Sequence, residues 1–247
     1  KRLRGTMARY VPKEVADRLL EGEGDALGGS LMEASVLFSD IRSFTTISER
    51  LGARETVTML NDYFSIMVDL IGNNQGILDK FIGDAIMAVF GAPFPGEKDA
   101  DNAVRAAVQM MQALHPFNEE RTLGGKDPVH IGIGVNTGEV VSGNIGSTKR
   151  MDYTVIGDGV NLAARLEGAT KPYGTAILVS EFTVAAIRDD YRIREVDRLR
   201  VKGKTKPVAV FEVMDHLIGR VHELDDVQGH YLEGLKAYKA RDWTVAK

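Results

Sequence analysis

The 247-residue sequence contains no cysteine, so disulfide bridges, thiolate zinc sites and cysteine nucleophiles are excluded. The five histidines are scattered through the chain and lack the spacing of a zinc site. No apolar run is long enough to span a bilayer. The net charge is −4, and no sustained basic run is present that would neutralise nucleic-acid phosphates. We therefore expect neither a membrane span nor a nucleic-acid partner.

The chain begins at Lys1 and shows no signal peptide. Hydrophobic residues make up 44% of it, enough to bury a normal core. We expect a soluble cytoplasmic fragment of a longer protein, itself multidomain or attached to a membrane elsewhere. We divide the fragment into an N-terminal linker (1–29), one large domain (30–214) and a C-terminal helical extension (215–247) that begins another module. The linker is interpreted as a short connector helix and loop, or alternatively as a signalling linker from an upstream domain.

The pattern of residues 77–90 predicts a tight hairpin with Gly83 and Asp84 at its tip. An aspartate at a turn usually only caps backbone groups. However, residues 34–41 form a second predicted buried strand, which carries Asp40 near its end. If the two strands pair, Asp40 and Asp84 lie side by side and need a cation to stay charged. Paired carboxylates without cysteine or histidine favour Mg²⁺.

Two long helices are predicted, over residues 54–71 and 99–114. The first carries two apolar stripes, which is typical of a core helix and also compatible with a subunit contact. On the second, Asp101 and Arg105 are predicted to form an exposed pair. Before the first helix, residues 42–46 offer Ser and Thr side chains for a helix cap and backbone N–H groups for an anion.

Residues 129–136 alternate Ile or Val with Gly, which indicates a strand that another backbone approaches closely. A third helix follows from Val160 to about Ala169. On it Asn161 and Arg165 are four apart and project together, which by itself is more typical of a solvated face. Further strands are predicted near residues 176–179, 192–200 and 208–213. The order β-α-β-β-α-β predicts an α+β, ferredoxin-like core with extra C-terminal strands and with helices on one face of a mainly antiparallel sheet.

Three blocks together resemble the signature of class III nucleotide cyclases: residues 38–45 (FSDIRSFT), 80–84 (KFIGD) and 153–165 (YTVIGDGVNLAAR). The resemblance covers roughly residues 31–214. Within the family the chain is similar to the bicarbonate-responsive soluble adenylyl cyclases of cyanobacteria. The resemblance implies an adenylate cyclase, a phosphorus–oxygen lyase that converts ATP to 3′,5′-cyclic AMP and pyrophosphate in intracellular signal transduction.

The same resemblance implies that Asp40, Asp84 and the carbonyl of Ile41 bind two Mg²⁺ ions, with Mn²⁺ or Ca²⁺ as substitutes at one or both positions. One metal would activate the attacking ribose 3′-hydroxyl, and the other would neutralise the leaving triphosphate. No general-base side chain is then required.

The resemblance also implies roles in binding the nucleotide. Asn161 would orient the ribose, and Arg165 would stabilise charge at the α-phosphate in the transition state. The phosphates would be bound by the N–H groups of Phe44 and Thr45, by Lys149 or Arg150, and by Lys202, from which Lys204 is hard to separate.

Adenine offers an acceptor at N1 and a donor at N6, which Lys80 and Thr154 respectively can match. Guanine would present an N–H to the lysine, so ATP is expected rather than GTP. Many adenylyl cyclases have Asp where this chain has Thr154. A threonine at this position resembles the bicarbonate-responsive branch, so bicarbonate is an expected effector.

In the family, the metal aspartates come from one subunit and the base and transition-state residues from the other. We therefore expect a two-fold homodimer with shared sites, although all six residues could instead converge within one monomer. Two other classes of function remain. A non-catalytic cyclase-like module should lack a metal, base or transition-state residue, and an RNA-binding sheet should carry an aromatic-rich strand motif, which is not found here.

Overall fold

The computed structural model describes residues 29–147, 150–200, 207–217, 221–244 and 246. The predicted linker over residues 1–29 therefore lies almost entirely outside the described residues.

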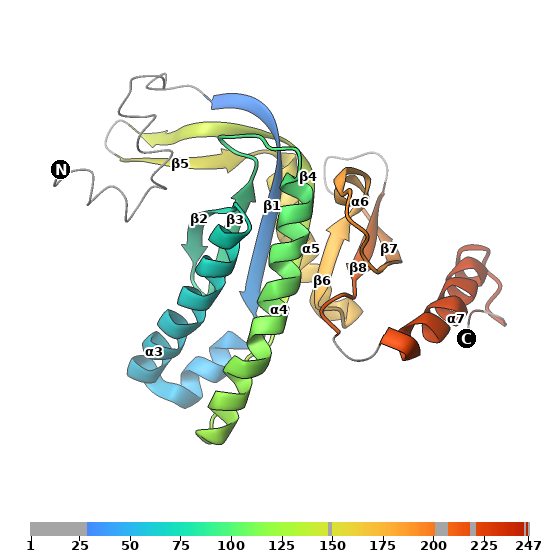
Figure 1. The fold of residues 1–247 in the computed structure, drawn as a ribbon, viewed down its shortest axis with the longest axis horizontal. Coiled ribbons are helices and arrows are strands. Elements are labelled where there is room, and N and C mark those ends of the chain that lie inside the picture. Colours follow the sequence, from blue (N-terminus) through green and yellow to red (C-terminus); the bar gives the residue numbers. More distant parts are fainter. Residues whose placement is uncertain (1–28, 148–149, 201–206, 218–220, 245, 247) are drawn as a thin grey trace.

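The core is the predicted ferredoxin-like unit (Figure 1). In chain order it consists of β1 (Gly29–Ile41), α3 (Phe44–Asn73), β2 (Ile77–Ile82), β3 (Ala85–Phe90), α4 (Asp99–Leu123) and β4 (Ile131–Ser147). The four strands lie in the order β2-β3-β1-β4, and each adjacent pair is antiparallel. The α+β fold class and the β-α-β-β-α-β order are confirmed.

Helices α3 and α4 cover one face of this sheet. Their buried side chains, among them Tyr63, Met67 and Met110, pack with Leu37 of β1 and Ile133 of β4 in the main core cluster. Alternation along β1 sends the neighbouring side chain, Val36, to a second cluster on the other face. The two helices of the unit thus share one face, as predicted.

The opposite face is covered by α5 (Asp158–Tyr173), which packs closely on β4. A Cβ atom at Gly134 would lie 2.2 Å from the backbone nitrogen of Glu167. The alternating glycines of β4 therefore allow the backbone of α5 to approach the sheet, which confirms the interpretation of that pattern.

Beyond the core, β4 forms a long hairpin with β5 (Arg150–Ile156) and pairs in parallel with β6 (Ile177–Ser180). The sheet continues through β8 (Val208–Val213) to β7 (Ile193–Leu199), with α6 (Glu181–Ala186) between β6 and β7 in sequence. The last helix, α7 (Val221–Lys239), lies in the C-terminal region predicted to be helical. It contacts the edge strand β7, because the Tyr231 hydroxyl donates to the carbonyl of Glu195 at 3.0 Å.

The bounds of all three predicted helices differ from the prediction, and α5 covers Asp158–Tyr173 rather than Val160 to about Ala169. Helix α3 begins at Phe44 rather than near residue 54, with a break at Gly52, whose φ of 72° and ψ of 167° are not helical. Helix α4 continues through Pro116 to Leu123 instead of ending at Leu114. Beyond the proline, the side chain of Asn118 forms hydrogen bonds with both backbone groups of Val129, which fixes the extended end against the start of β4.

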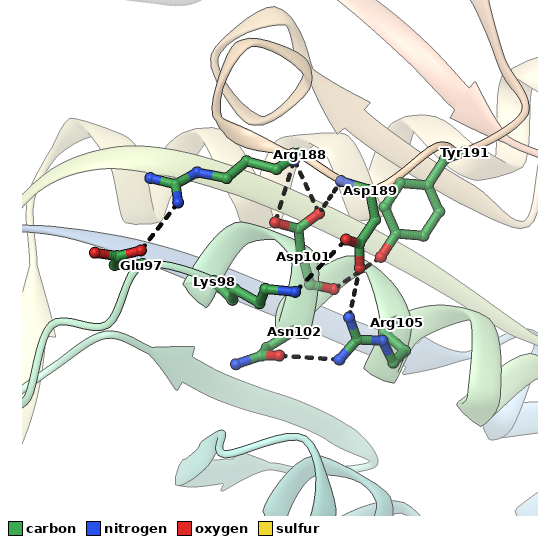
Figure 2. A network of polar contacts seen from close by, with 8 residues as sticks. All are labelled: Glu97, Lys98, Asp101, Asn102, Arg105, Arg188, Asp189 and Tyr191. Carbon is green, nitrogen blue, oxygen red and sulfur yellow. Dashed lines mark hydrogen bonds and ion pairs between the residues drawn. The ribbon is translucent and has the colours of Figure 1, made fainter.

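The predicted exposed pair of Asp101 and Arg105 is wrong (Figure 2). Asp101 is fully buried and accepts hydrogen bonds from the backbone N–H groups of Arg188 and Asp189. Arg105 instead pairs with Asp189 at 2.7 Å. The carboxylate is used to anchor the segment between α6 and β7 to the start of α4, a tertiary contact that helical spacing does not reveal.

Candidate active site

The pairing of β1 with β3 brings Asp40 and Asp84 together. In this register Ser39 lies opposite Ile86, so Asp40 at the end of β1 adjoins the turn that holds Asp84. The turn is the predicted two-residue one, since Ile82 pairs with Ala85 and Gly83 has a φ of 66°. Burial and the adjacent Asp40 raise the pKa of Asp84 to about 6, although backbone N–H groups of Asp84 and Ile41 act in the opposite direction.

The Asp84 carboxylate has unused capacity for a ligand. Its Oδ2 atom is buried and has no hydrogen-bond partner within the part of the chain that the structure describes. A buried oxygen of this kind fits a hard cation held by carboxylate and carbonyl oxygens. Across the same residues, no group of three or more His, Cys, Asp or Glu gathers as a self-sufficient metal cage. The residues present therefore fit a cation that also takes ligands from a bound phosphate.

Sequence reasoning missed Glu167, which lies on α5 near the aspartates. Burial and the negative charges of Asp40 and Asp84 together raise its pKa to about 7, although Arg42 acts in the opposite direction. Arg42 itself donates to the carbonyl of Thr175 at 2.5 Å and so ties the end of β1 to the start of β6. No motif signal marked Glu167, because only the packing of α5 on the sheet brings it near the two aspartates.

The start of α3 presents backbone donors beside Asp40. Ser43 at the N-cap adopts a left-handed conformation, with φ 57° and ψ 32°, and its side chain makes no capping hydrogen bond. The predicted hydroxyl cap is therefore wrong at this residue. Phe44 and Thr45 belong to the first helical turn, whose N–H groups have no intrahelical acceptors and are suited to an anion.

Lys80 and Thr154, the two residues predicted to bind the base, both contact a third residue, Asp79. The Thr154 hydroxyl of β5 donates to Asp79 Oδ2 of β2 at 2.8 Å, and Lys80 Nζ lies 3.3 Å from the same oxygen. These strands contact each other although β3, β1 and β4 separate them in the hydrogen-bonded order. The structure thus brings Lys80 and Thr154 together and adds a buried carboxylate that sequence reasoning did not single out.

Asn161 and Arg165 are exposed on α5. Glu167 is two residues beyond Arg165 and faces the aspartates of its own chain. Because residues two apart lie on nearly opposite sides of a helix, Arg165 points away from Asp40 and Asp84 of the same chain. The single chain does not bring the two sets of predicted residues together.

Some of the predicted phosphate ligands cannot be placed. Lys149, Lys202 and the alternative Lys204 lie outside the described residues, and so does the side chain of Arg150, the first residue of β5.

Residues 29–215 match the family described as the adenylate and guanylate cyclase catalytic domain. The chain belongs to this family. It is 41% identical over 191 residues to an adenylate cyclase of Anabaena cylindrica, covering 74% of this chain and 37% of the relative. It is 34% identical over 210 residues to adenylate cyclase 1 of Rhizobium meliloti, covering 85% and 32%. The chain thus spans about a third of the length of each of these curated relatives.

Solved cyclase structures share the fold. The adenylyl cyclase CyaB from P. aeruginosa matches with a TM-score of 0.71 and 37% identity, covering 76% of this chain and 96% of that one. The guanylyl cyclase Cya2 matches with a TM-score of 0.69 and 41% identity, covering 76% and 94%. Relatives at similar identity are therefore named for either nucleotide. None of the helices described here has the length and apolar character needed to cross a membrane.

Proposed function

We propose that this domain converts ATP to 3′,5′-cyclic AMP and pyrophosphate. Membership of the cyclase family supports the reaction, and the relatives named adenylate cyclase support the substrate. The likeness to a guanylyl cyclase means that family membership alone does not choose the base. The observation that carries the choice of ATP is the meeting of Lys80 and Thr154, which together match the acceptor at adenine N1 and the donor at N6.

Asp40, Asp84 and the carbonyl of Ile41 would hold the metals. The buried, unpartnered Oδ2 of Asp84 supports this assignment, as does the mutual repulsion of the two carboxyl groups. Two bound Mg²⁺ ions, or Mn²⁺ or Ca²⁺ in their place, would supply a lower pKa for the ribose 3′-hydroxyl and neutralisation of the leaving triphosphate.

The chain's own groups position the nucleotide. The N–H groups of Phe44 and Thr45 would bind phosphate oxygens at the start of α3, where no side-chain cap competes for them. Lys149, Arg150 and Lys202 are proposed as further phosphate ligands from the resemblance alone.

The site would be shared between two copies of the chain. Asn161 would orient the ribose and Arg165 would stabilise the α-phosphate, yet Arg165 points away from the aspartates of its own chain. A two-fold dimer lets the exposed face of α5 from one copy approach the metal pair of the other, which generates two equivalent sites.

Bicarbonate stimulation is proposed from the resemblance at Thr154. Thr154 is only 7% exposed, and its hydroxyl donates a hydrogen bond to Asp79.

The decisive experiment is an assay of the purified chain with ATP or GTP and Mg²⁺ or Mn²⁺, with the products separated by chromatography. Cyclic AMP formed from ATP, and little cyclic GMP formed from GTP, is expected. A matched control is Arg165→Ala, which lies on the exposed face of α5 and should fold normally. Nucleotide binding without any cyclic product would instead indicate a non-catalytic module.

A further inference from the structure

Asp79 is the extra residue of a β-bulge in β2. In the pairing of β2 with β3, Leu78 lies opposite Ala88 and Lys80 lies opposite Met87, so Asp79 has no partner residue. In a regular strand, Asp79 and Lys80 would point to opposite faces. At the bulge this alternation is broken, and Asp79 Oδ2 reaches Lys80 of its own strand as well as Thr154 of β5.

The contact between Asp79 and Thr154 is sheltered from water. The side chain of Asp79 is 5% exposed, and Thr154 is 7% exposed. Burial raises the pKa of Asp79, and the hydrogen bond from Thr154, the charge of Lys80 and the backbone N–H of Val155 oppose this rise. In this bond the Thr154 hydroxyl donates and Asp79 Oδ2 accepts, at a distance of 2.8 Å.

A threonine hydroxyl has one hydrogen and two lone pairs. When the hydrogen is committed to Asp79, only lone pairs remain for the base. Adenine presents the N6 amino group, a donor that these lone pairs can accept. Guanine presents the O6 carbonyl, which is also an acceptor. It would face the lone pairs of the Thr154 hydroxyl with no hydrogen to form a bond.

We infer that Asp79 is a positioning residue that fixes the Thr154 hydroxyl as an acceptor and so makes the site selective for adenine over guanine. This inference rests on the proposed function. It explains how a threonine, which in principle can donate or accept, reads only one of the two purines. Asp79 acts through Thr154 and need not touch the nucleotide.

Asp79 also has a hydrogen bond with the backbone N–H of Val155, and its contact with Lys80 is weaker than its contact with Thr154. The Lys80 side chain is 39% exposed, so solvent screens its ion pair with Asp79. The bond to Thr154 is shorter and more buried, and an unsatisfied buried group costs more than a screened pair. The selectivity is therefore assigned to the hydroxyl.

The test compares kcat/KM for ATP and for GTP in purified protein with Mg²⁺. The variants are Asp79→Leu, which has similar size and no acceptor, and Asp79→Asn, whose amide oxygen can still accept. Thr154→Val removes the hydroxyl and keeps the shape. The double variant Asp79→Leu/Thr154→Val completes a double-mutant cycle, which measures the coupling between the two residues. Circular dichroism and thermal denaturation show that each variant is folded.

We expect Asp79→Leu to lower the ATP-to-GTP ratio of kcat/KM by about tenfold, because the freed hydrogen can turn toward guanine O6. Asp79→Asn should have a smaller effect. In the Thr154→Val background, Asp79→Leu should change the ratio by less than about twofold. A purely structural role would lower both kcat/KM values equally and leave the ratio unchanged.

Two results would overturn the inference: an unchanged ratio in folded Asp79→Leu, or an equally large change in the Thr154→Val background. Either result, with wild-type protein that makes cyclic AMP from ATP, contradicts only the role of Asp79. Wild-type protein that makes no cyclic AMP contradicts the proposed function itself.

Discussion

Asp40 near the end of β1 and Asp84 in the turn between β2 and β3 lie so close that Asp40 adds to the effect of burial, and together they raise the pKa of Asp84 to about 6. The two carboxyl groups repel each other when both are charged, and one oxygen of Asp84 has no hydrogen-bond partner among the described groups. Such an arrangement is costly for the metal-free protein and favourable once a cation binds. Relief of the repulsion between these two side chains would therefore contribute to the affinity of the proposed metal site.

The first prediction concerns Asp84→Asn, which keeps the shape and removes the charge. Cyclic AMP formation at saturating Mg²⁺ should fall by more than about 100-fold. Mutating a residue that only supports a metal ligand costs up to about 100-fold in activity, and Asp84 would be a ligand itself. The metal-free variant should be more stable than wild type by roughly 1 kcal/mol, because the repulsion with Asp40 is removed. Thermal denaturation in EDTA measures the stability. A variant with near-normal turnover would refute the assignment of Asp84 as a metal ligand.

The second prediction concerns pH. The folded-state pKa of Asp84, about 6, lies above its ordinary value of 3.8, so the folded protein binds this proton more tightly than the unfolded chain. Metal-free protein should therefore lose stability as pH rises from about 4 through 6, and Glu167, with a pKa of about 7, extends the loss. The melting temperature in EDTA should drop by about 2–4 °C between pH 5 and 7 from Asp84 alone.

Added Mg²⁺ should raise the melting temperature more at pH 7 than at pH 5, because protons compete with the metal at low pH. Asp84→Asn should show a shallower decline in EDTA than wild type. A melting temperature that rises over the same interval would contradict the raised pKa.

The third prediction concerns the base. Lys80→Glu combined with Thr154→Cys should weaken the use of ATP and allow some use of GTP, because a glutamate accepts from the guanine N–H groups. Rates with each nucleotide at several concentrations give the ratio of kcat/KM. An unchanged preference in the folded double variant would mean that the base is read elsewhere.

The hairpin and its aspartate were predictable because their signals are local. Gly83 provides the positive φ of the turn, and apolar strands flank it on both sides. Asp79 was not predictable, because regular alternation places it on the face opposite Lys80 and only the bulge changes this. Its partner Thr154 is 75 residues away and reaches it through the tertiary fold. Likewise, Pro116 marks a helix end by local rules, yet the hydrogen bonds of Asn118 with Val129 hold the helix beyond it.

The fourth prediction concerns regulation and rests on the resemblance at Thr154. Bicarbonate at fixed pH should raise the rate of cyclic AMP formation, and chloride at the same ionic strength should not. Thr154→Asp, which restores the residue found in many adenylyl cyclases, is the matched variant and should abolish the stimulation. Equal responses to both salts would reduce the effect to ionic strength.

The last prediction concerns assembly. Asp40→Ala damages the metal half of a site, and Arg165→Ala damages the transition-state half. Each variant alone should lose activity by at least about 100-fold, since an electrostatic donor to the transition state is commonly worth that much. The exposed Arg165 faces away from the aspartates of its own chain, so in a mixed dimer one interface site inherits both lesions and the other inherits none.

Equal mixing with free exchange makes half of the dimers mixed, and each mixed dimer has one intact site. Activity should therefore recover to about a quarter of the wild-type value. Exchange is verified independently by energy transfer between labelled copies, and mixing each variant with itself provides the control. If the two inactive proteins exchange subunits and remain inactive together, the residues of each site belong to one chain and the shared-site dimer is refuted.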